Sequence, residues 1–375
     1  MFTVLSVSTF VSCSDDDNND NPFAEREAAL SPAVAQYVSN TVVATYQSLA
    51  DATIELHTAI ETLKTSKTQS NLNAATQKWI SARKYWELSE AFLFGAAGDF
   101  GIDPHIDTWP LGEPAFIALM NNSTYINFMD AEDGDVWASD NLGSSLLGFH
   151  GIEFILFENG KSKDVSKVKD NELIYALAVA GDLRNQCVRL EVAWAGIDAV
   201  TSDKKELVED LDLQVCMQNG SSYGEDMLTA GKAGSTYKTV TAAAVAVIAG
   251  CIDISDEVGE VKIGTAYSKD DVTYIESPYS FNSKVDFADN IRSIENAYIG
   301  GVEGKRGASI SEYVKGVDAE LDATLKAAIA NAIAKIDAIP YPFAQNYTSA
   351  EAGVALAACQ ELTATLEDVK ALLQK

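Results

Sequence analysis

The sequence predicts an all-α protein made of two packed four-helix-bundle-like domains. Apolar residues recur at helical spacing through several long segments, and very few segments alternate in the manner of a β-strand. Glycine and proline separate these segments into two sets of roughly four, and long antiparallel helices pack as bundles. Two segments, 79–95 and 287–300, both end with an aromatic residue shortly before a glycine. This shared ending hints that the two domains are related by internal duplication.

The first half of the chain is expected to be helical apart from one long insert. This insert carries three prolines, and ordered loops of such length usually serve function rather than connection. Serine before proline is a strong signal for the start of a helix. The expected elements are helices over 31–64 (beginning at Ser31 and Pro32) and 70–95, a loop-rich insert over 96–143, a helix that carries His150, and helices over 170–194 and 206–217.

The second half repeats this organisation after a break rich in glycine and serine over 219–235. A boundary in this break divides the folded part of the chain into domains of residues 30–220 and 221–375. The expected helices cover 236–266 (interrupted at Gly250), 285–298, 317–338 and 348–373.

The N-terminus carries the features of a targeting segment. The apolar run Phe2–Val11 is too short to span a bilayer and leads directly to Ser12 and Cys13. Such a run before a cysteine resembles a bacterial lipoprotein signal over residues 1–13, with Cys13 as the lipidated residue. The acidic stretch that follows cannot bury apolar surface, so we expect a disordered tether over residues 14–29. These features predict a cell-envelope lipoprotein of the outer membrane, on its periplasmic side or at the cell surface.

Charge and cysteine content narrow the class of protein. The formal net charge of -28 argues against nucleic acid and anionic membranes as partners, so we expect membrane contact through the lipid anchor only. We also expect the protein to be a monomer. The remaining cysteines lack the CxxC spacing of a zinc site, which leaves buried free thiols or one or two disulfides. These cysteines are Cys187, Cys216, Cys251 and Cys359.

The strongest candidate for a functional site is the pair His150 and Glu153 in an otherwise apolar helix. Side chains three residues apart on a helix share one face, and a buried carboxylate needs a cation, strong donors or a proton. Gly148 and Gly151 flank the pair, which indicates that another backbone passes close by. The plain alternative is a buried hydrogen-bonded pair that only fixes how the bundle packs.

Two further clusters supply acids for the same site. Arg83, Glu87 and Glu90 are spaced to lie on one face of the second helix, although Arg83 and Glu87 could also form a surface ion pair. Asp107 lies in the proline-bounded insert. Carboxylates with one imidazole suit iron or zinc, and di-iron carboxylate proteins assemble such sites from facing helices.

Several ordered blocks of sequence resemble the imelysin-like family over essentially the whole chain after the tether. In the first half these are Lys78-Trp79, Arg83, Trp86–Phe92 and Gly95, then Asp103-Pro104, Ile106-Asp107 and Trp109-Pro110, and the Gly148-x-His150-x-x-Glu153 motif. In the second half they are Glu276–Ser280, Asp286-Phe287, Asn290-Ile291 and Tyr298-x-Gly300.

The resemblance implies a fold of two related helical bundles with the GxHxxE motif near their junction, and a link to bacterial iron uptake. It implies a bound metal ion, expected to be iron, with zinc or another divalent ion as alternatives, and partners among outer-membrane or iron-transport components. The implied metal ligands are Glu87, Glu90, Asp107, His150 and Glu153, with Asp103 as an alternative to Asp107. We expect Arg83, Gly148, Asp103, Trp109 and Ser280 to support the ligand site.

Two alternatives to a metal-binding protein remain open, and the first follows from the classification of the family as metallopeptidases. The first is a peptidase of extracellular proteins, although zinc peptidases with HExxH or HxxEH need two helical histidines and Phe154 occupies the second position here. His57 and His105 lie elsewhere, and His105 could support the site because it neighbours Asp107. The second is a non-catalytic receptor subunit for a partner protein or an organic chelate.

Overall fold

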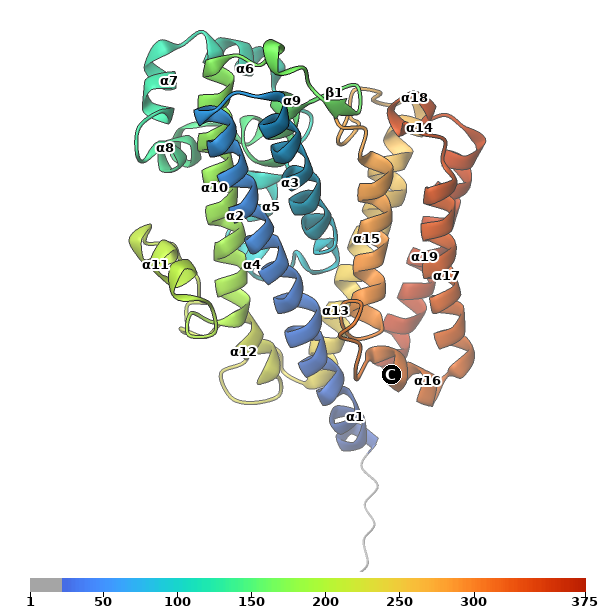
Figure 1. Ribbon diagram of the computed structural model, residues 1–375. Coiled ribbons are helices and arrows are strands. Elements are labelled where there is room, and N and C mark those ends of the chain that lie inside the picture. Colours follow the sequence, from blue (N-terminus) through green and yellow to red (C-terminus); the bar gives the residue numbers. More distant parts are fainter. Residues whose placement is uncertain (1–21) are drawn as a thin grey trace, which may run out of the picture.

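The computed structural model describes residues 22–375 and confirms an all-α fold (Figure 1). The described residues contain one two-stranded antiparallel hairpin, formed by β1 (Phe157–Glu158) and β2 (Lys161–Ser162). The signal segment with Cys13, and residues 14–21 of the expected tether, lie outside the described residues. No helix in the described part of the chain is long and apolar enough to cross a membrane.

The long helices form two sets whose members contact one another in a closed ring. In the first set α2 packs on α3 and α10, and the short α9 closes the ring between α3 and α10. The helices are α1 (Pro22–Tyr37), the π-helical η1 (Val38–Val43), α2 (Ala44–Thr65), α3 (Gln69–Glu87), α9 (Gly148–Leu156) and α10 (Asp170–Ala195), followed by α11 (Ser202–Asp210) and α12 (Tyr223–Leu228).

In the second set α13, α15, α17 and α19 pack in sequence, and α19 closes the ring against α13. The two sets meet where α3 contacts α15 and where α1 contacts α13. The helices are α13 (Val240–Asp256), the π-helical η5 (Glu257–Gly264), α14 (Thr265–Ser268), α15 (Ser283–Tyr298), α16 (Ile310–Val317), α17 (Ala319–Ala338), α18 (Phe343–Asn346) and α19 (Ala350–Leu373). That the sets arose by duplication stays a prediction.

Local sequence explains why the long helices begin where they do. A hydroxyl or carboxylate at the N-cap accepts a hydrogen bond from a free backbone N–H of the first turn. The caps of α3, α13, α17 and α19 are Thr68, Thr239, Asp318 and Ser349. Each helix then buries one apolar face, as in α19, where the spacing of three and four residues continues to the end through Ala352, Ala355, Cys359, Leu362, Leu366, Val369 and Leu373.

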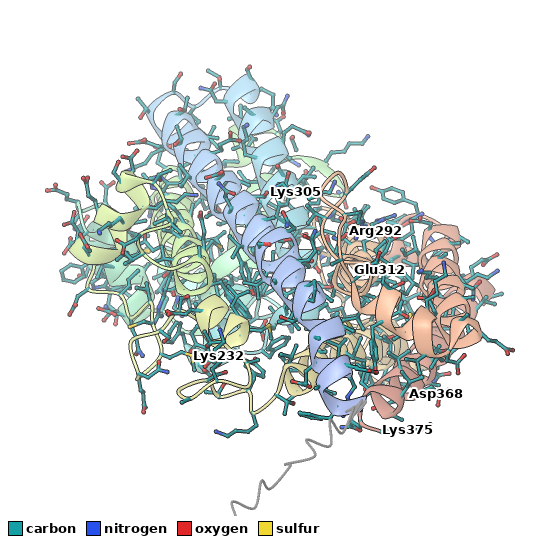
Figure 2. The ribbon with its side chains drawn as sticks, turned by 90° about the horizontal axis from the view of Figure 1, so that it is seen from below. Lys232, Arg292, Lys305, Glu312, Asp368 and Lys375 are labelled. Atoms are coloured by element: carbon teal, nitrogen blue, oxygen red, sulfur yellow. The ribbon has the colours of Figure 1, made fainter. Side chains whose placement is uncertain are left out.

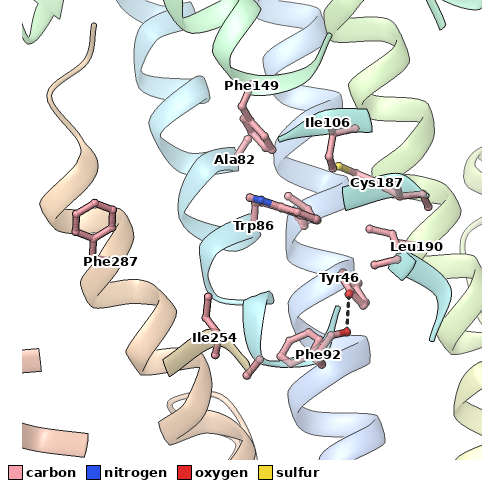
Figure 3. Packing of buried hydrophobic residues seen from close by; sticks show 14 of the residues in the cluster. Tyr46, Ala82, Trp86, Phe92, Ile106, Phe149, Cys187, Leu190, Ile254 and Phe287 are labelled. Atoms are coloured by element: carbon pink, nitrogen blue, oxygen red, sulfur yellow. Dashed lines mark hydrogen bonds between the residues drawn. The ribbon is translucent and has the colours of Figure 1, made fainter. Parts of the chain in front are cut away.

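A continuous apolar core extends across both sets of helices. Figure 3 shows Trp86 of α3 between Phe149 of α9 and the side chains of α10, with the Tyr46 hydroxyl hydrogen-bonded to the carbonyl oxygen of Phe92. Trp79 and Trp86 are fully buried, as their helical spacing predicts. The aromatic core thus holds α3 in a fixed position at the centre of the molecule.

Several predicted boundaries are wrong. The first helix begins at Pro22 and continues through Ser31 and Pro32, because Leu30, Ala33 and Val34 are all buried and packing outweighs the lost backbone hydrogen bond of proline. Residues 22–29 of the expected tether are therefore helical. The second helix ends at Glu87 rather than near residue 95, and Glu90 begins a separate 3-10 turn, η2 (Glu90–Phe92).

The insert and the long helix of the second half also differ from prediction. The insert is mostly helical, because its prolines lie within or near the first turns of short helices, where proline is tolerated. The helix over 240–256 is not interrupted at Gly250, where an added Cβ would meet the carbonyl oxygen of Ala91 at 2.3 Å. The insert contains α4 (Ala96–Asp99), α5 (Ile102–Ile106), α6 (Glu113–Met120), α7 (Ser123–Met129) and α8 (Gly134–Asn141). After the insert, the 3-10 turn η3 (Ser144–Leu146) precedes α9 and the 3-10 turn η4 (Val165–Lys167) precedes α10.

The four cysteines of the described chain are free thiols, so the disulfide alternative is not supported. Cys187, Cys251 and Cys359 are buried, whereas Cys216 is partly exposed. Burial raises the pKa of Cys359 to about 12, so this thiol is neutral and unreactive at ordinary pH.

Candidate functional site

The structure brings all five predicted ligands into one buried region at the junction of the two helix sets. Glu87 and Glu153 are completely buried, and Glu90, Asp107 and His150 are no more than 5% exposed. The prediction that acids from separate segments converge on one imidazole is therefore confirmed. Their roles as metal ligands stay predictions.

Gly148 explains how α9 and α5 approach closely enough for this convergence. Its φ of +70° lies in the left-handed region, and an added Cβ would lie 1.8 Å from the carbonyl oxygen of Ile106. The backbone of α5 thus passes directly against the start of α9, as the glycines predict. At Gly151 the close neighbour is instead the hydroxyl of Tyr175. As a result, Nε2 of His150 lies 3.2 Å from Oδ1 of Asp107.

Glu153 orients the imidazole and ties it to the second helix set. Its Oε2 lies 3.0 Å from Nδ1 of His150, so Nδ1 carries the proton that is shared with the carboxylate. Its Oε1 accepts hydrogen bonds from the backbone N–H of Tyr279 at 3.0 Å and from the N–H and hydroxyl of Ser280 at 2.8 and 2.7 Å. Nε2 of His150 has no hydrogen-bond partner within the described chain.

Arg83 joins acids from both halves of the chain. Its guanidinium donates to Asp107, lies 2.5 Å from Oε1 of Glu87, and donates to Glu276 at 2.7 Å. It also lies 3.7 Å from Asp286. An arginine that is fully buried needs such partners, because an unpaired buried charge is very costly. Arg83 is therefore a fixed counter-ion at the centre of the site.

Lys262 of η5 is the second buried base. Its ammonium donates to Oε1 of Glu276 at 3.1 Å and lies 3.8 and 4.0 Å from oxygens of Glu87 and Glu90. It also lies 3.9 Å from Glu257 at the edge of the region. Asn290 of α15 donates to Oε2 of Glu87 at 2.5 Å.

Sequence reasoning missed four members of this region. Glu276 and Asp286 both fall within blocks that resemble the family, but only Ser280 was chosen from them. Asn290 lies in the same blocks, whereas Lys262 shares η5 with Glu257 and Glu260, so its local sequence gives no signal that it is buried. We call the following residues the charge cluster: Arg83, Glu87, Glu90, Asp107, His150, Glu153, Lys262, Glu276 and Asp286.

The charge cluster contains more acids than bases. Six carboxyl groups surround two permanent cations, Arg83 and Lys262, together with His150. Burial raises the pKa of Glu87 and of Glu90 well above the usual range despite the nearby bases, and burial also raises the pKa of Asp286 to about 6. Protons or a further cation must therefore balance the cluster.

Asp107 and His150 form a strongly polarised pair. Burial would raise the pKa of Asp107, but the guanidinium of Arg83 and the imidazole of His150 hold it below its usual range. Burial would lower the pKa of His150, but the neighbouring carboxylates of Asp107 and Glu153 outweigh burial and raise the pKa to about 9. In the metal-free protein the imidazole is therefore protonated at neutral pH.

Two groups of side chains have ligand atoms close enough together to hold a metal ion. The histidine group consists of Asp107, His150 and Glu276, and the glutamate group of Glu87, Glu90 and Asp107. Within each group the ligand atoms lie within 4.8 Å of one another. Buried oxygens of Glu87 and Glu276 lack hydrogen-bond partners among residues 22–375, as does Nε2 of His150. Atoms of these types suit a hard or borderline cation, although Oε1 of Glu87 already lies 2.5 Å from the guanidinium of Arg83.

The other predicted residues lie around this centre. Asp103 belongs to neither group, which favours Asp107 as the ligand, and burial raises the pKa of Asp103 to about 7. Trp109 covers the centre, with its ring centroid 5.4 Å from the ammonium of Lys262. His105 instead contacts Asp182 of α10 at 2.8 Å, and His57 lies on α2.

Two cavities adjoin the junction of the helix sets. The larger, about 860 Å³, lies between α2, α3 and α15, contains none of the charge cluster, and is lined by Lys84, Arg292, Lys305 and Arg306 among others. Figure 2, which views the molecule from below, labels two of these lining residues, Arg292 and Lys305. The smaller, about 600 Å³, is lined by Trp109 and Glu257, which also contact Lys262. We call it the acidic cavity, because its other charged residues are Asp253, Asp256 and Glu367.

Comparisons with known proteins identify similar sequences and structures. Iron-regulated protein A of Synechococcus elongatus is 28% identical over 333 residues, which cover 88% of this chain and 82% of that protein. A crystal structure from Parabacteroides distasonis, described as an iron-regulated protein A precursor, has a TM-score of 0.76 and 29% identity, and the match covers 92% of this chain and 95% of that chain.

A further crystal structure shares the fold. The imelysin-like protein of Psychrobacter arcticum has a TM-score of 0.59 at 13% identity, with 93% of this chain and 94% of that chain covered. The family model for imelysin (Peptidase_M75) matches residues 42–369, which is nearly the whole described chain. The chain therefore belongs to the imelysin family.

Proposed function

We propose that this protein captures iron outside the cytoplasm and holds it in the charge cluster as cargo for iron uptake. The observation that carries the proposal is the histidine group, in which a buried imidazole nitrogen without a hydrogen-bond partner faces two carboxylates. Two relatives are named iron-regulated protein A, which links them to iron through their regulation and is the reason for choosing iron as the metal in this proposal.

The geometry supports a division of labour among the predicted ligands. Asp107, His150 and Glu276 would bind the ion, and Glu87 and Glu90 would supply further oxygens from the glutamate group. Both oxygens of Glu153 already accept hydrogen bonds, so its proposed role is to orient His150. A carboxylate behind a ligating histidine fixes its ring and raises its basicity. The bound ion would replace protons as the balancing charge.

Binding is favoured over peptide hydrolysis by the histidine content of the site. The zinc motifs of peptidases place two histidines and a catalytic glutamate on one helix. Here each metal-capable group holds at most one histidine, and His57 and His105 lie outside both. Moreover, the centre is buried beneath Trp109 rather than open to a polypeptide.

We also propose that the protein acts as a lipoprotein anchored through Cys13 and delivers iron to outer-membrane or iron-transport components. The apolar run before Cys13 and the acidic stretch after it support this location. Substituting Cys13 with alanine in cells and following the protein by membrane fractionation tests the anchor.

Metal analysis and titration calorimetry of the full-length protein, with ferrous iron and with zinc, test the binding proposal. We expect the wild type to bind iron stoichiometrically and His150→Gln to lose at least about tenfold in affinity, because the only imidazole ligand is gone. His105→Gln is the matched control, since it removes a histidine hydrogen-bonded to a carboxylate outside the cluster. Equal binding by His150→Gln and the wild type, or no binding by the wild type, would refute the proposal.

A further inference from the structure

Lys262 is held differently from the other buried bases of the protein. Its ammonium has three N–H donors, yet within the described chain it makes one hydrogen bond, to Glu276 at 3.1 Å. The remaining carboxylates near it lie at 3.8 Å or more. By contrast, the ammonium of Lys204 lies 2.6 Å from both Asp51 and Glu191. Lys262 thus balances charge without being tightly bound to any one acid.

Lys262 lies next to both groups of side chains that could hold a cation. Its ammonium contacts Glu276 of the histidine group and lies within 4.0 Å of Glu87 and Glu90 of the glutamate group. A metal ion bound by either group would therefore have a positive charge as its close neighbour. Repulsion between two cations at such a distance in a buried site is large.

The acidic cavity offers the ammonium a second place. Glu257 and Trp109 line this cavity, and the ammonium of Lys262 lies 3.9 Å from Oε1 of Glu257 and 5.4 Å from the ring centroid of Trp109. The cavity contains no lysine or arginine in its lining, whereas four acids line it. A flexible lysine side chain could turn toward Glu257 and the cavity and remain paired with a carboxylate.

We propose that the ammonium of Lys262 occupies the place of the cation in the metal-free protein and moves toward the acidic cavity when a metal ion binds. The proposal rests on the proposed function, since the ion is the one held by the charge cluster. Lys262 is then a residue that tunes affinity: it stabilises the empty site and must be displaced to fill it. Arg83, which lies at or below 2.7 Å from three acids, stays in place.

Lys262→Met in the full-length protein tests this proposal with ferrous iron as the probe under anaerobic conditions. Without a competing ammonium, we expect iron to bind roughly tenfold or more tightly than in the wild type. The metal-free variant should melt at a lower temperature than the wild type, and iron should raise its melting temperature by more. Lys204→Met, which removes the tightly paired buried lysine, should leave iron affinity unchanged.

A second measurement uses the wild type alone and does not depend on whether the variant folds. Lys262 is 1% exposed, so an amine-reactive reagent should label it slowly in the metal-free protein. Iron should increase labelling of Lys262, measured by mass spectrometry of its peptide, and leave that of Lys204 unchanged.

The outcomes separate this inference from the proposed function. If the wild type binds iron but Lys262→Met binds no more tightly, or iron leaves the labelling of Lys262 unchanged, the displacement of Lys262 is refuted and the binding function stands. If neither the wild type nor Lys262→Met binds iron, both proposals fall.

Discussion

At His150 one hydrogen bond decides which nitrogen is available to a metal. Because Nδ1 donates to Glu153, the free position is Nε2, which faces Asp107. A protonated imidazole cannot ligate, and the pKa of His150 is raised to about 9. At neutral pH a metal must therefore displace the proton from Nε2.

This competition predicts the direction of the pH dependence. Below pH 9 the neutral imidazole becomes about tenfold more abundant with each unit of pH, so iron affinity should rise about tenfold per unit between pH 5.5 and 7.5. The slope should be steeper if Glu87 and Glu90 also lose protons on binding, because burial raises the pKa of both. Calorimetry in two buffers of different ionisation enthalpy measures the protons released. An affinity independent of pH would show that His150 is not a ligand.

At the scale of helices and turns, sequence predicted the centre of the molecule better than its edges. The burial of Trp79 and Trp86 and the contact at Gly148 follow from spacing and from the lack of a side chain, which are local properties. The end of α3 at Glu87 does not, because Ala91 and Phe92 continue an apolar pattern that the 3-10 turn buries equally well. Glu90 consequently reaches the cluster from a turn rather than from the face of α3.

For a related reason, the local sequence pattern could not identify the members of the charge cluster that sequence analysis missed. Glu276 lies beside the predicted ligands, and Asp286 acts as a counter-ion of Arg83, only because α3 packs against α15 and brings Arg83 to both carboxylates. Such contacts between segments nearly two hundred residues apart are set by the fold and leave no periodic signal. The resemblance to a family marked both blocks, but it did not say which side chain points inward.

The crossing of α5 and α9 gives a prediction at this scale. Gly148→Ala should destabilise the protein by about 2–4 kcal/mol, because the left-handed φ and the collision with Ile106 both oppose a side chain. It should also weaken iron binding, since His150 and Asp107 are carried by the two crossing helices. Urea unfolding and iron titration measure the two effects.

Gly101→Ala is the matched control for this change. Its φ of +63° is similar, but no heavy atom outside its chain neighbours lies within 4 Å of an added Cβ. We expect a loss of only about 1 kcal/mol, the cost of the left-handed backbone itself, with iron affinity unchanged. If the two substitutions prove equal in both measurements, close contact of the two backbones does not position the site.

At the scale of the whole molecule, the charge cluster joins the two helix sets through buried polar contacts. The first set supplies Arg83, Asp107 and His150, and the second supplies Lys262 and Glu276. Glu153 adds a direct connection through hydrogen bonds to the turn before α15. An ion bound here would therefore stabilise both halves of the chain at once.

Hydrogen exchange of the full-length protein, with and without ferrous iron, measures this coupling. We expect iron to slow hydrogen exchange in segments from both halves. An ion that binds the native state but not the locally opened states raises the free energy of local opening. The helix α11, which lies outside the cluster and packs on α10, should be unaffected and serves as the internal reference. His150→Gln should remove the effect in both halves. Protection confined to the first half would show that Glu276 takes no part in binding, and would reduce the site to the glutamate group with His150. The segments expected to respond are 83–90, 103–109, 148–153, 257–264 and 276–290.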